Sequence, residues 1–259
     1  MSRRFSDPLL SASSSLSFKG WWVELCRAVQ RRRWGGFALL SLLTLCGASQ
    51  PLSAVEVTGK LRLVGTNGEE LQLAEIAEAV VFFRPEAGAK VQAPRRPVSL
   101  VTKNKDFAPR VLTIPVGATV IFPNEDPILH NVFSVSPRNR FDLGLYSRGQ
   151  GKTHTFDSPG LVRVYCNVHP DMAAYLLVLD TPHHVQPNPD GSFRLEGLPP
   201  GPGTLTIWQE RSRPWSQRLV IPQRGALQPL KVNMTVDRPR IQPHLNKFGK
   251  PYGRGERYR

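Results

Sequence analysis

Residues 166–172 read C-N-V-H-P-D-M and carry a cysteine, a histidine and a methionine at regular spacing. Thiolate, imidazole and thioether are soft or borderline metal ligands, and Cys166, His169 and Met172 offer one of each from a short segment. The alternative is packing, because a buried cysteine behaves as a small hydrophobic side chain. The spacing C-x-x-H-x-x-M favours a metal site.

A trigonal set of one cysteine and two histidines, with a weak axial methionine, is the arrangement of blue-copper electron-transfer sites. The second histidine must come from elsewhere, and the candidate is His130, in N-E-D-P-I-L-H after a predicted strand. Two neighbouring loops at one end of a β-sandwich can converge on one ion. The remaining histidines are expected at the surface: His154, His183, His184 and His244.

Residues 1–54 are predicted to be a leader. Three arginines at 31–33 precede a short apolar run and then small residues, which is the order of a secretory signal. The run is shorter than the roughly 20 apolar residues of a membrane span, so an uncleaved anchor is the less favoured alternative. We expect export to the periplasm, with cleavage between Ala48 and Ala54.

Export changes the meaning of the cysteines. Cys26 and Cys46 lie in the predicted leader, so Cys166 is left alone in the mature chain and has no disulfide partner there. A free thiol outside the cytoplasm is prone to oxidation unless something occupies it. A bound metal would occupy it.

Charge is concentrated at the two ends of the chain. Residues 238–259 hold seven Lys and Arg and one acidic residue, whereas residues 55–237 are nearly balanced. We interpret 238–259 as a basic, solvated tail, with contact to an anionic surface or an acidic partner as the alternative. Nucleic acid is not an expected partner, because the chain has no recognisable nucleic-acid-binding module.

Short apolar runs separated by turn residues predict an all-β protein. The chain holds 24 prolines and 21 glycines, and β-rich runs recur at 110–124, 131–135, 152–156, 161–166 and 174–180. This spacing is typical of a β-sandwich, which strands from residues 55–85 are expected to complete, with a loop at 86–97. A second, smaller unit follows residue 181, with strands near 204–208, 218–222 and 227–236.

The span 110–180 resembles the cupredoxins of the amicyanin and plastocyanin type. F-D-S-P-G-L-V-R-V-Y-C is similar to the strand that leads to their cysteine, and H-N-V and C-N-V-H-P-D-M are similar to their ligand segments. The resemblance implies a Greek-key β-sandwich with one type 1 copper per chain. It also implies specific residue roles. The copper ligands would be His130, Cys166, His169 and Met172.

The same resemblance assigns supporting residues. Asn131 would bind the loop that holds the cysteine, and Asn167 and Pro170 would complete the surroundings of the ligands. Tyr165 and His169 would carry electrons in and out.

Beyond the copper domain, D-G-x-F-x-L and L-P-P-G-x-x-x-L-x-x-W resemble a carboxypeptidase regulatory-like domain. The whole mature chain resembles bacterial methylamine utilisation proteins. The expected organisation is N-terminal strands and a loop (55–100), a cupredoxin domain (101–181), a regulatory-like β-sandwich (182–237) and the tail (238–259).

The function implied is transfer of single electrons between unidentified redox proteins, without enzyme activity. Dinuclear copper sites need a second cysteine, and multicopper oxidases and copper nitrite reductases place a histidine directly after the cysteine, where this chain has Asn167. Two alternatives stay open: copper storage or delivery, and a structural envelope module that binds copper incidentally.

Overall fold

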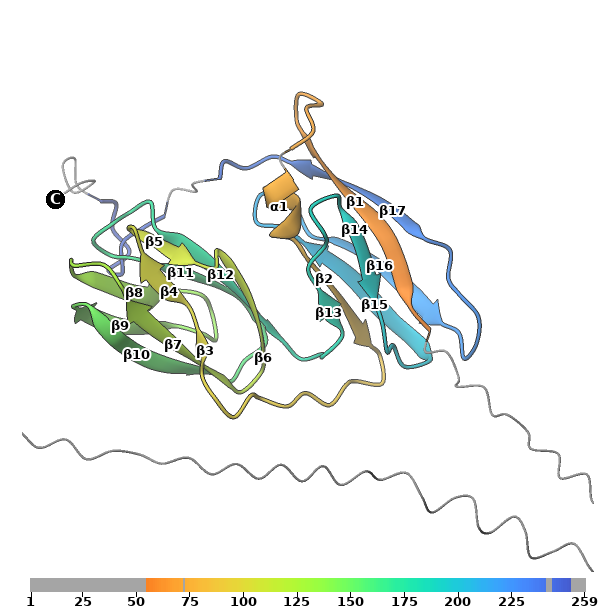
Figure 1. Ribbon diagram of the computed structural model, residues 1–259, viewed down its shortest axis with the longest axis horizontal. Coiled ribbons are helices and arrows are strands. Elements are labelled where there is room, and N and C mark those ends of the chain that lie inside the picture. The colour runs from red at the N-terminus through yellow and green to blue at the C-terminus, as the bar shows by residue number, and fades with distance from the viewer. Residues whose placement is uncertain (1–54, 72, 241–243, 253–259) are drawn as a thin grey trace, which may run out of the picture. The chain divides into compact units, whose positions relative to one another are not determined.

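The computed structural model describes residues 55–71, 73–240 and 244–252 (Figure 1). These residues form seventeen strands and one short helix, so the predicted all-β class is confirmed. Within these ranges no helix has the length and apolar character needed to cross a membrane. The predicted leader, including Cys26, Cys46 and the expected cleavage region, lies outside the described residues.

The first sandwich, residues 98–179, consists of two facing sheets. One sheet has the order β10-β7-β4-β5, with β3 also paired to β7: β3 (Val98–Ser99), β4 (Val101–Lys103), β5 (Asp106–Ala108), β7 (Ala118–Asn124) and β10 (Gly149–Phe156). The other has the order β6-β12-β11-β8-β9: β6 (Val111–Pro115), β8 (His130–Ser134), β9 (Phe141–Tyr146), β11 (Gly160–Tyr165) and β12 (Ala173–Leu179).

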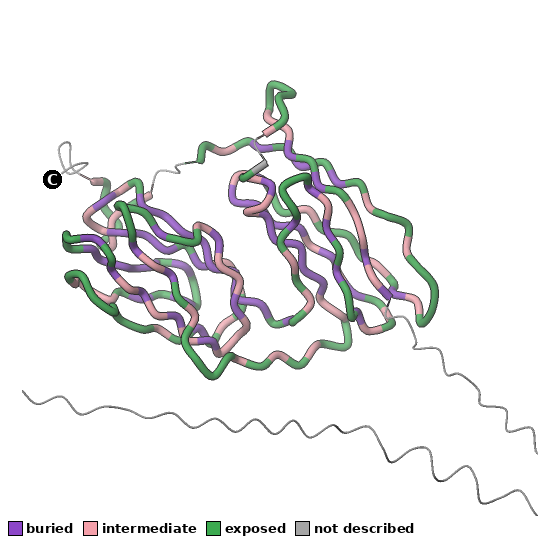
Figure 2. Tube along the Cα trace, viewed as in Figure 1, coloured by how far each residue is buried: buried purple, intermediate pink, exposed green. Residues whose placement is uncertain are grey.

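Alternating burial builds the core of this sandwich. In β7 the side chains of Val120 and Phe122 are fully buried, while their neighbours along the strand are half-buried. They pack in one cluster with Val162 and Val164 of β11 from the opposite sheet. Figure 2 shows the same contrast between buried strand positions and exposed connecting loops. The period of two turns one face of β7 toward the core, whereas β8 and β12 are buried at every position.

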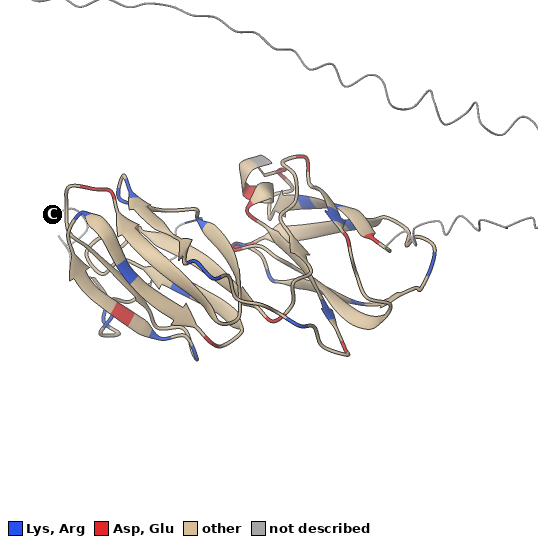
Figure 3. Cartoon of the chain, turned by 60° about the horizontal axis from the view of Figure 1, so that its bottom comes forward, with Lys and Arg blue, Asp and Glu red and all other residues tan. Residues whose placement is uncertain are grey.

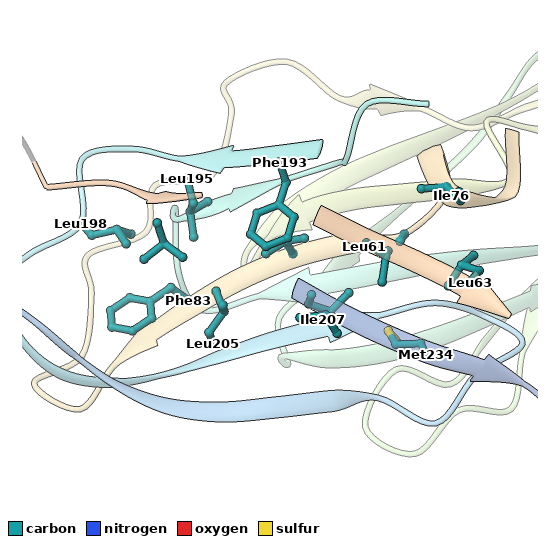
Figure 4. Close-up of a cluster of buried hydrophobic side chains, with 14 of the residues drawn as sticks. Leu61, Leu63, Ile76, Phe83, Phe193, Leu195, Leu198, Leu205, Ile207 and Met234 are labelled. Carbon is teal, nitrogen blue, oxygen red and sulfur yellow. The ribbon is translucent and has the colours of Figure 1, made fainter. Parts of the chain in front are cut away.

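The second sandwich packs two smaller sheets around its own core (Figure 4). One sheet has the order β14-β1-β17: β1 (Val57–Gly65), β14 (Ser192–Leu195) and β17 (Leu230–Val236). The other has the order β13-β2-β15-β16: β2 (Val80–Pro85), β13 (His184–Val185), β15 (Gly201–Trp208) and β16 (Trp215–Ile221). The helix α1 (Leu73–Ala77) connects β1 to β2 and contributes Ile76 to this core.

The strands of residues 55–85 do not complete the first sandwich, contrary to the sequence-based expectation. β1 pairs with β14 and, in parallel, with β17, whereas β2 pairs with β13 and β15. The second sandwich is therefore discontinuous in sequence, and the first is inserted between β2 and β13. The sequence predicts these strands correctly, but neither the alternation of β1 nor the apolar run of β2 carries information about which sheet they join.

A buried ion pair links the two sandwiches. Arg110, directly before β6, donates from Nε to both carboxylate oxygens of Glu210 at 3.1 and 2.8 Å. The Glu210 side chain is fully buried and that of Arg110 is 13% exposed. Burial raises the pKa of Glu210, and the guanidinium of Arg110 partly offsets this effect. Beside the pair, Tyr175 of β12 and Trp208 of β15 pack with ring centroids 5.6 Å apart.

Replacing Glu210 with Gln should lower the free energy of unfolding by about 3 kcal/mol, because it leaves a largely buried guanidinium without its counter-ion. Urea denaturation of the metal-free protein measures this change. The matched control is Glu86→Gln, which removes an exposed pair with Arg218 and should leave the midpoint nearly unchanged. Equal effects of the two substitutions would contradict a structural role for the Arg110–Glu210 pair.

Candidate metal centre

Three candidate ligand atoms meet in the first sandwich. The side chains of His130, Cys166 and His169 each present one ligand atom, and these atoms lie within 4.8 Å of one another. The Cys166 sulfur lies 3.8 Å from His130 Nδ1 and 3.6 Å from His169 Nδ1, and the two nitrogens are 3.2 Å apart. Cys166 and His130 are fully buried and His169 is 9% exposed.

His130 is oriented by a carboxylate that the sequence analysis did not identify. Its Nε2 lies 2.9 Å from Asp126 Oδ2, so the imidazole donates there and leaves the Nδ1 lone pair facing Cys166. Burial alone would raise the pKa of Asp126, but hydrogen bonds from two backbone amides and from His130 bring it below its ordinary value. Asp126 is therefore a carboxylate that fixes both the tautomer and the orientation of the ring.

A β-hairpin supplies the two amides that hold Asp126. β4 and β5 pair with Lys103 opposite Asp106, so Asn104 and Lys105 form a two-residue turn. Both have positive φ, 55° and 58°, as a type I′ turn requires. Their amides donate to Asp126 at 2.7 and 2.9 Å. The asparagine in K-N-K-D favours such a turn, but nothing local links the turn to residue 126.

The segment 166–172 connects β11 to β12 and carries the other ligand candidates. Its ends are joined by a hydrogen bond from the Cys166 amide to the Met172 carbonyl at 3.3 Å, and the Met172 amide donates to the His169 carbonyl at 3.1 Å. Met172 is almost completely buried and packs in the same core cluster as Cys166. The compact turn therefore brings the Cys166 sulfur and His169 Nδ1 together, and the hydrogen bond between Cys166 and Met172 closes the loop.

Protonation in the metal-free site follows from burial. Burial raises the pKa of the Cys166 thiol, although backbone amides of Asn131, Val168 and His169 donate toward the sulfur and oppose the increase. Burial also lowers the pKa of both His130 and His169, which keeps the imidazoles neutral near pH 7. Neutral imidazoles can accept a metal, and a bound cation would favour the thiolate.

The supporting residues differ in part from expectation. Asn131 does not bind the cysteine loop through its side chain: Nδ2 donates to Asp142 Oδ1 at 2.7 Å, and only its backbone amide reaches the cysteine sulfur. A register shift between Asn131 and Phe133 accompanies this arrangement in the β8–β9 pair, where Asp142 lies opposite Phe133. The Asn131 Oδ1 atom is buried with no hydrogen-bond partner among the described residues.

The C-terminal segment, which we define as residues 244–252, contacts three of the predicted supporting residues: Tyr165, Asn167 and Pro170. The sequence predicts a solvated tail and a surface position for His244, but the His244 ring stacks on Tyr165 with centroids 3.9 Å apart. The basic composition of the segment gave no sign of this packing. Contact of the tail with an anionic surface stays a prediction, and residues 253–259 lie outside the described residues.

The remaining histidines do not join the site. His154 is half-buried and stacks on Phe141 with centroids 4.5 Å apart. His183 is half-buried and His184 is exposed, next to β2 of the second sandwich. The group that could hold a metal among the described residues is the one formed by His130, Cys166 and His169.

The donor set fits a soft or borderline metal ion. Metal–nitrogen bonds of about 2.0 Å and metal–sulfur bonds of about 2.3 Å in a trigonal plane separate nitrogens by about 3.5 Å and nitrogen from sulfur by about 3.7 Å. The corresponding separations here are 3.2 Å for the nitrogens and 3.6 and 3.8 Å to the sulfur. The ligand atoms are thus already arranged for a single ion.

Removing the carboxylate in Asp126→Ala should weaken Cu(II) binding by about 10–100-fold, because His130 loses the acceptor that holds its ring. Competition with a chelator measures the affinity. The control is Glu125→Ala, which removes the adjacent carboxylate from an exposed pair with Lys103. Circular dichroism should show both variants folded, and an unchanged affinity in Asp126→Ala would exclude the orienting role.

No family model matches the chain, and neither does any curated protein. Among solved structures, a purple cupredoxin from Nitrosopumilus maritimus is 25% identical, covering 31% of this chain and 98% of its own, with a TM-score of 0.29. A reduced amicyanin mutant is 20% identical over 38% and 98%, with a TM-score of 0.31. The copper-containing nitrite reductase from Thermus scotoductus SA-01 is 29% identical over 45% and 28%, with a TM-score of 0.32. Each likeness covers less than half of this chain, so the case for a metal rests on the ligand atoms themselves.

Proposed function

We propose that this protein carries single electrons by means of one copper ion bound by His130, Cys166 and His169, with Met172 as a weak axial ligand. The observation that carries the proposal is the convergence of one thiol sulfur and two imidazole Nδ1 atoms in a buried space. Copper in such a ligand set supplies reversible one-electron chemistry.

The protein's own residues would bind the ion and exclude water. Cys166 and His130 are fully buried and His169 nearly so, which leaves little access for a substrate. Asn167 follows the cysteine, so the chain lacks the histidine that multicopper oxidases and copper nitrite reductases place directly after it. Both features favour electron transfer over catalysis.

The exit for electrons is proposed at His169. Among the three converging ligands it alone retains measurable exposure, at 9%. Tyr165 was the other candidate, but its ring is covered by His244, so a route through Tyr165 would lead into the C-terminal segment rather than directly to a partner.

The partner is proposed to be another redox protein that docks through a small, largely apolar contact. Leu129 precedes His130 and is 52% exposed, and Leu145, opposite Asn131 in the β8–β9 pair, is 55% exposed. Lys and Arg are interspersed with Asp and Glu over the described strands (Figure 3). Such a surface suits the brief, small interfaces of electron-transfer complexes.

Export to the periplasm is part of the proposal. Outside the cytoplasm the Cys166 thiol would be prone to oxidation, and a bound metal would protect it. The resemblance to methylamine utilisation proteins, and that of residues 182–237 to a carboxypeptidase regulatory-like domain, stay predictions from sequence. Copper delivery is the rival function. The burial of all three converging ligands argues against it, because delivery requires ready release of the ion.

The purified mature protein should bind one copper per chain and show an intense visible band from the bond between Cu(II) and the Cys166 thiolate. Cys166→Ser should abolish the band, because an alcohol cannot supply the thiolate. Absorption spectra with copper quantification test both statements. A colourless wild type at full copper loading would refute the type 1 assignment, and rapid copper loss to a mild chelator would favour delivery.

Met172→Leu should retain the visible band and raise the reduction potential, because loss of a weak axial donor destabilises Cu(II) more than Cu(I). Leucine keeps the volume and apolar character of this buried position, so packing changes little. Protein-film or solution voltammetry measures the potential. An unchanged value would mean that Met172 packs in the core without acting as a ligand.

A further inference from the structure

The C-terminal segment lies against the ligand loop 166–172 (Figure 1). It is far from the loop in sequence and belongs to neither sandwich core. Three hydrogen bonds join them, each to a different residue of the loop: Tyr252 Oη to the Cys166 carbonyl at 3.2 Å, the Lys247 amide to Asn167 Oδ1 at 3.0 Å and His244 Nε2 to the Pro170 carbonyl at 2.7 Å.

The segment has a defined turn of its own. The Asn246 amide donates to the Lys250 carbonyl at 2.8 Å, and the Gly249 amide donates to the Asn246 carbonyl at 2.9 Å. The Asn246 side chain accepts the amides of Phe248 and Lys250 at 3.0 Å each. Lys247 therefore sits inside a closed turn, which fixes where its amide meets the loop.

Aromatic packing fills the space between the hydrogen bonds. The His244 ring stacks on Tyr165, the residue before Cys166, at an interplanar angle of 15°. Tyr252 contacts His244 edge-on, with centroids 5.3 Å apart. The segment thus covers the strand end that leads into the loop as well as the loop itself.

A second connection runs to the strand that carries His130. Lys247 Nζ pairs with Asp142 Oδ2 at 2.7 Å, and the other carboxylate oxygen accepts Asn131 Nδ2 at 2.7 Å. The Asn131 amide in turn donates toward the Cys166 sulfur. The C-terminal segment is therefore bonded directly to the ligand loop and, through Asp142 of β9 and Asn131, is linked to the strand β8 that carries His130.

We propose that residues 244–252 are a positioning element of the metal centre, which holds loop 166–172 in its ligand-presenting conformation before metal binds and slows release of the metal afterwards. The first half of the proposal concerns the metal-free chain, and the second rests on the proposed copper function. Ligands that are ordered in advance lose less conformational entropy when the ion binds.

The test uses the full chain with His244→Ala and Tyr252→Phe combined. These changes remove two of the three hydrogen bonds to the loop. Loss of each bond should raise the equilibrium constant for opening of the loop by a factor of roughly five. In the metal-free protein, amide hydrogen exchange at residues 167–169, 171 and 172 should become at least about tenfold faster. The control is Phe248→Ala in the same turn. Phe248 is 71% exposed and its ring lies under Lys247 Nζ, 5.3 Å from it, so this substitution leaves the three hydrogen bonds to the loop in place and should give wild-type exchange.

Tyr252→Phe alone is the milder variant, since it removes only the hydroxyl that reaches the Cys166 carbonyl, and it should give a smaller increase in the same amides. Unchanged exchange in both folded variants would overturn the proposal. So would an increase spread evenly over both sandwiches, because it would report general destabilisation.

Copper release is the second readout. From the copper-loaded double variant, transfer of copper to an excess of chelator should be about tenfold faster than from wild type or Phe248→Ala. Equal release rates would overturn the claim that the segment slows metal loss. A wild type that binds no copper would refute the proposed function, whereas the exchange result in the metal-free chain would still decide the positioning role.

Discussion

Two imidazole nitrogens and a thiol sulfur must face one another in a buried space, and the surrounding structure depends on this constraint. Without a metal these atoms gain little from their proximity, and burial deprives them of water. The scaffold must therefore hold each of these residues either by the ring nitrogen that faces away from the site or by its backbone. Asp126 holds His130, and a closed turn between β11 and β12 holds Cys166 and His169.

The ligand candidates were predictable because their information is local. Residue type and spacing identify Cys166, His169 and Met172 within one segment, and His130 lies between two predicted strands, 110–124 and 131–135. Asp126 could not be recognised in the same way. Its role depends on a hairpin about twenty residues earlier in the chain, made of strands of only three residues each, too short for alternation to reveal.

The pairing of strands that lie far apart in the chain could not be predicted from the sequence either. The alternation of β1 and the continuous apolar run of β2 suit a strand of either sandwich, and the parallel partner of β1 is β17, the last strand of the described residues. The C-terminal segment illustrates the same limit. Its basic composition is typical of a solvated tail, but its order comes from contacts with residues 142–170 that composition does not encode.

The insertion of the first sandwich has a consequence for the order of synthesis. The chain leaves the second sandwich after β2 and returns to it at β13, where His184 pairs with Phe82. Once residue 179 has been translated, every strand of the first sandwich is present. At that point β1 has neither of its partners, because β14 and β17 come later in the chain. Lys60 and Arg62 are exposed on β1, and charged side chains on an unpaired strand discourage its pairing with another chain. The ligand loop receives its contacts from residues 244–252 only after all seventeen strands of the described residues have been translated.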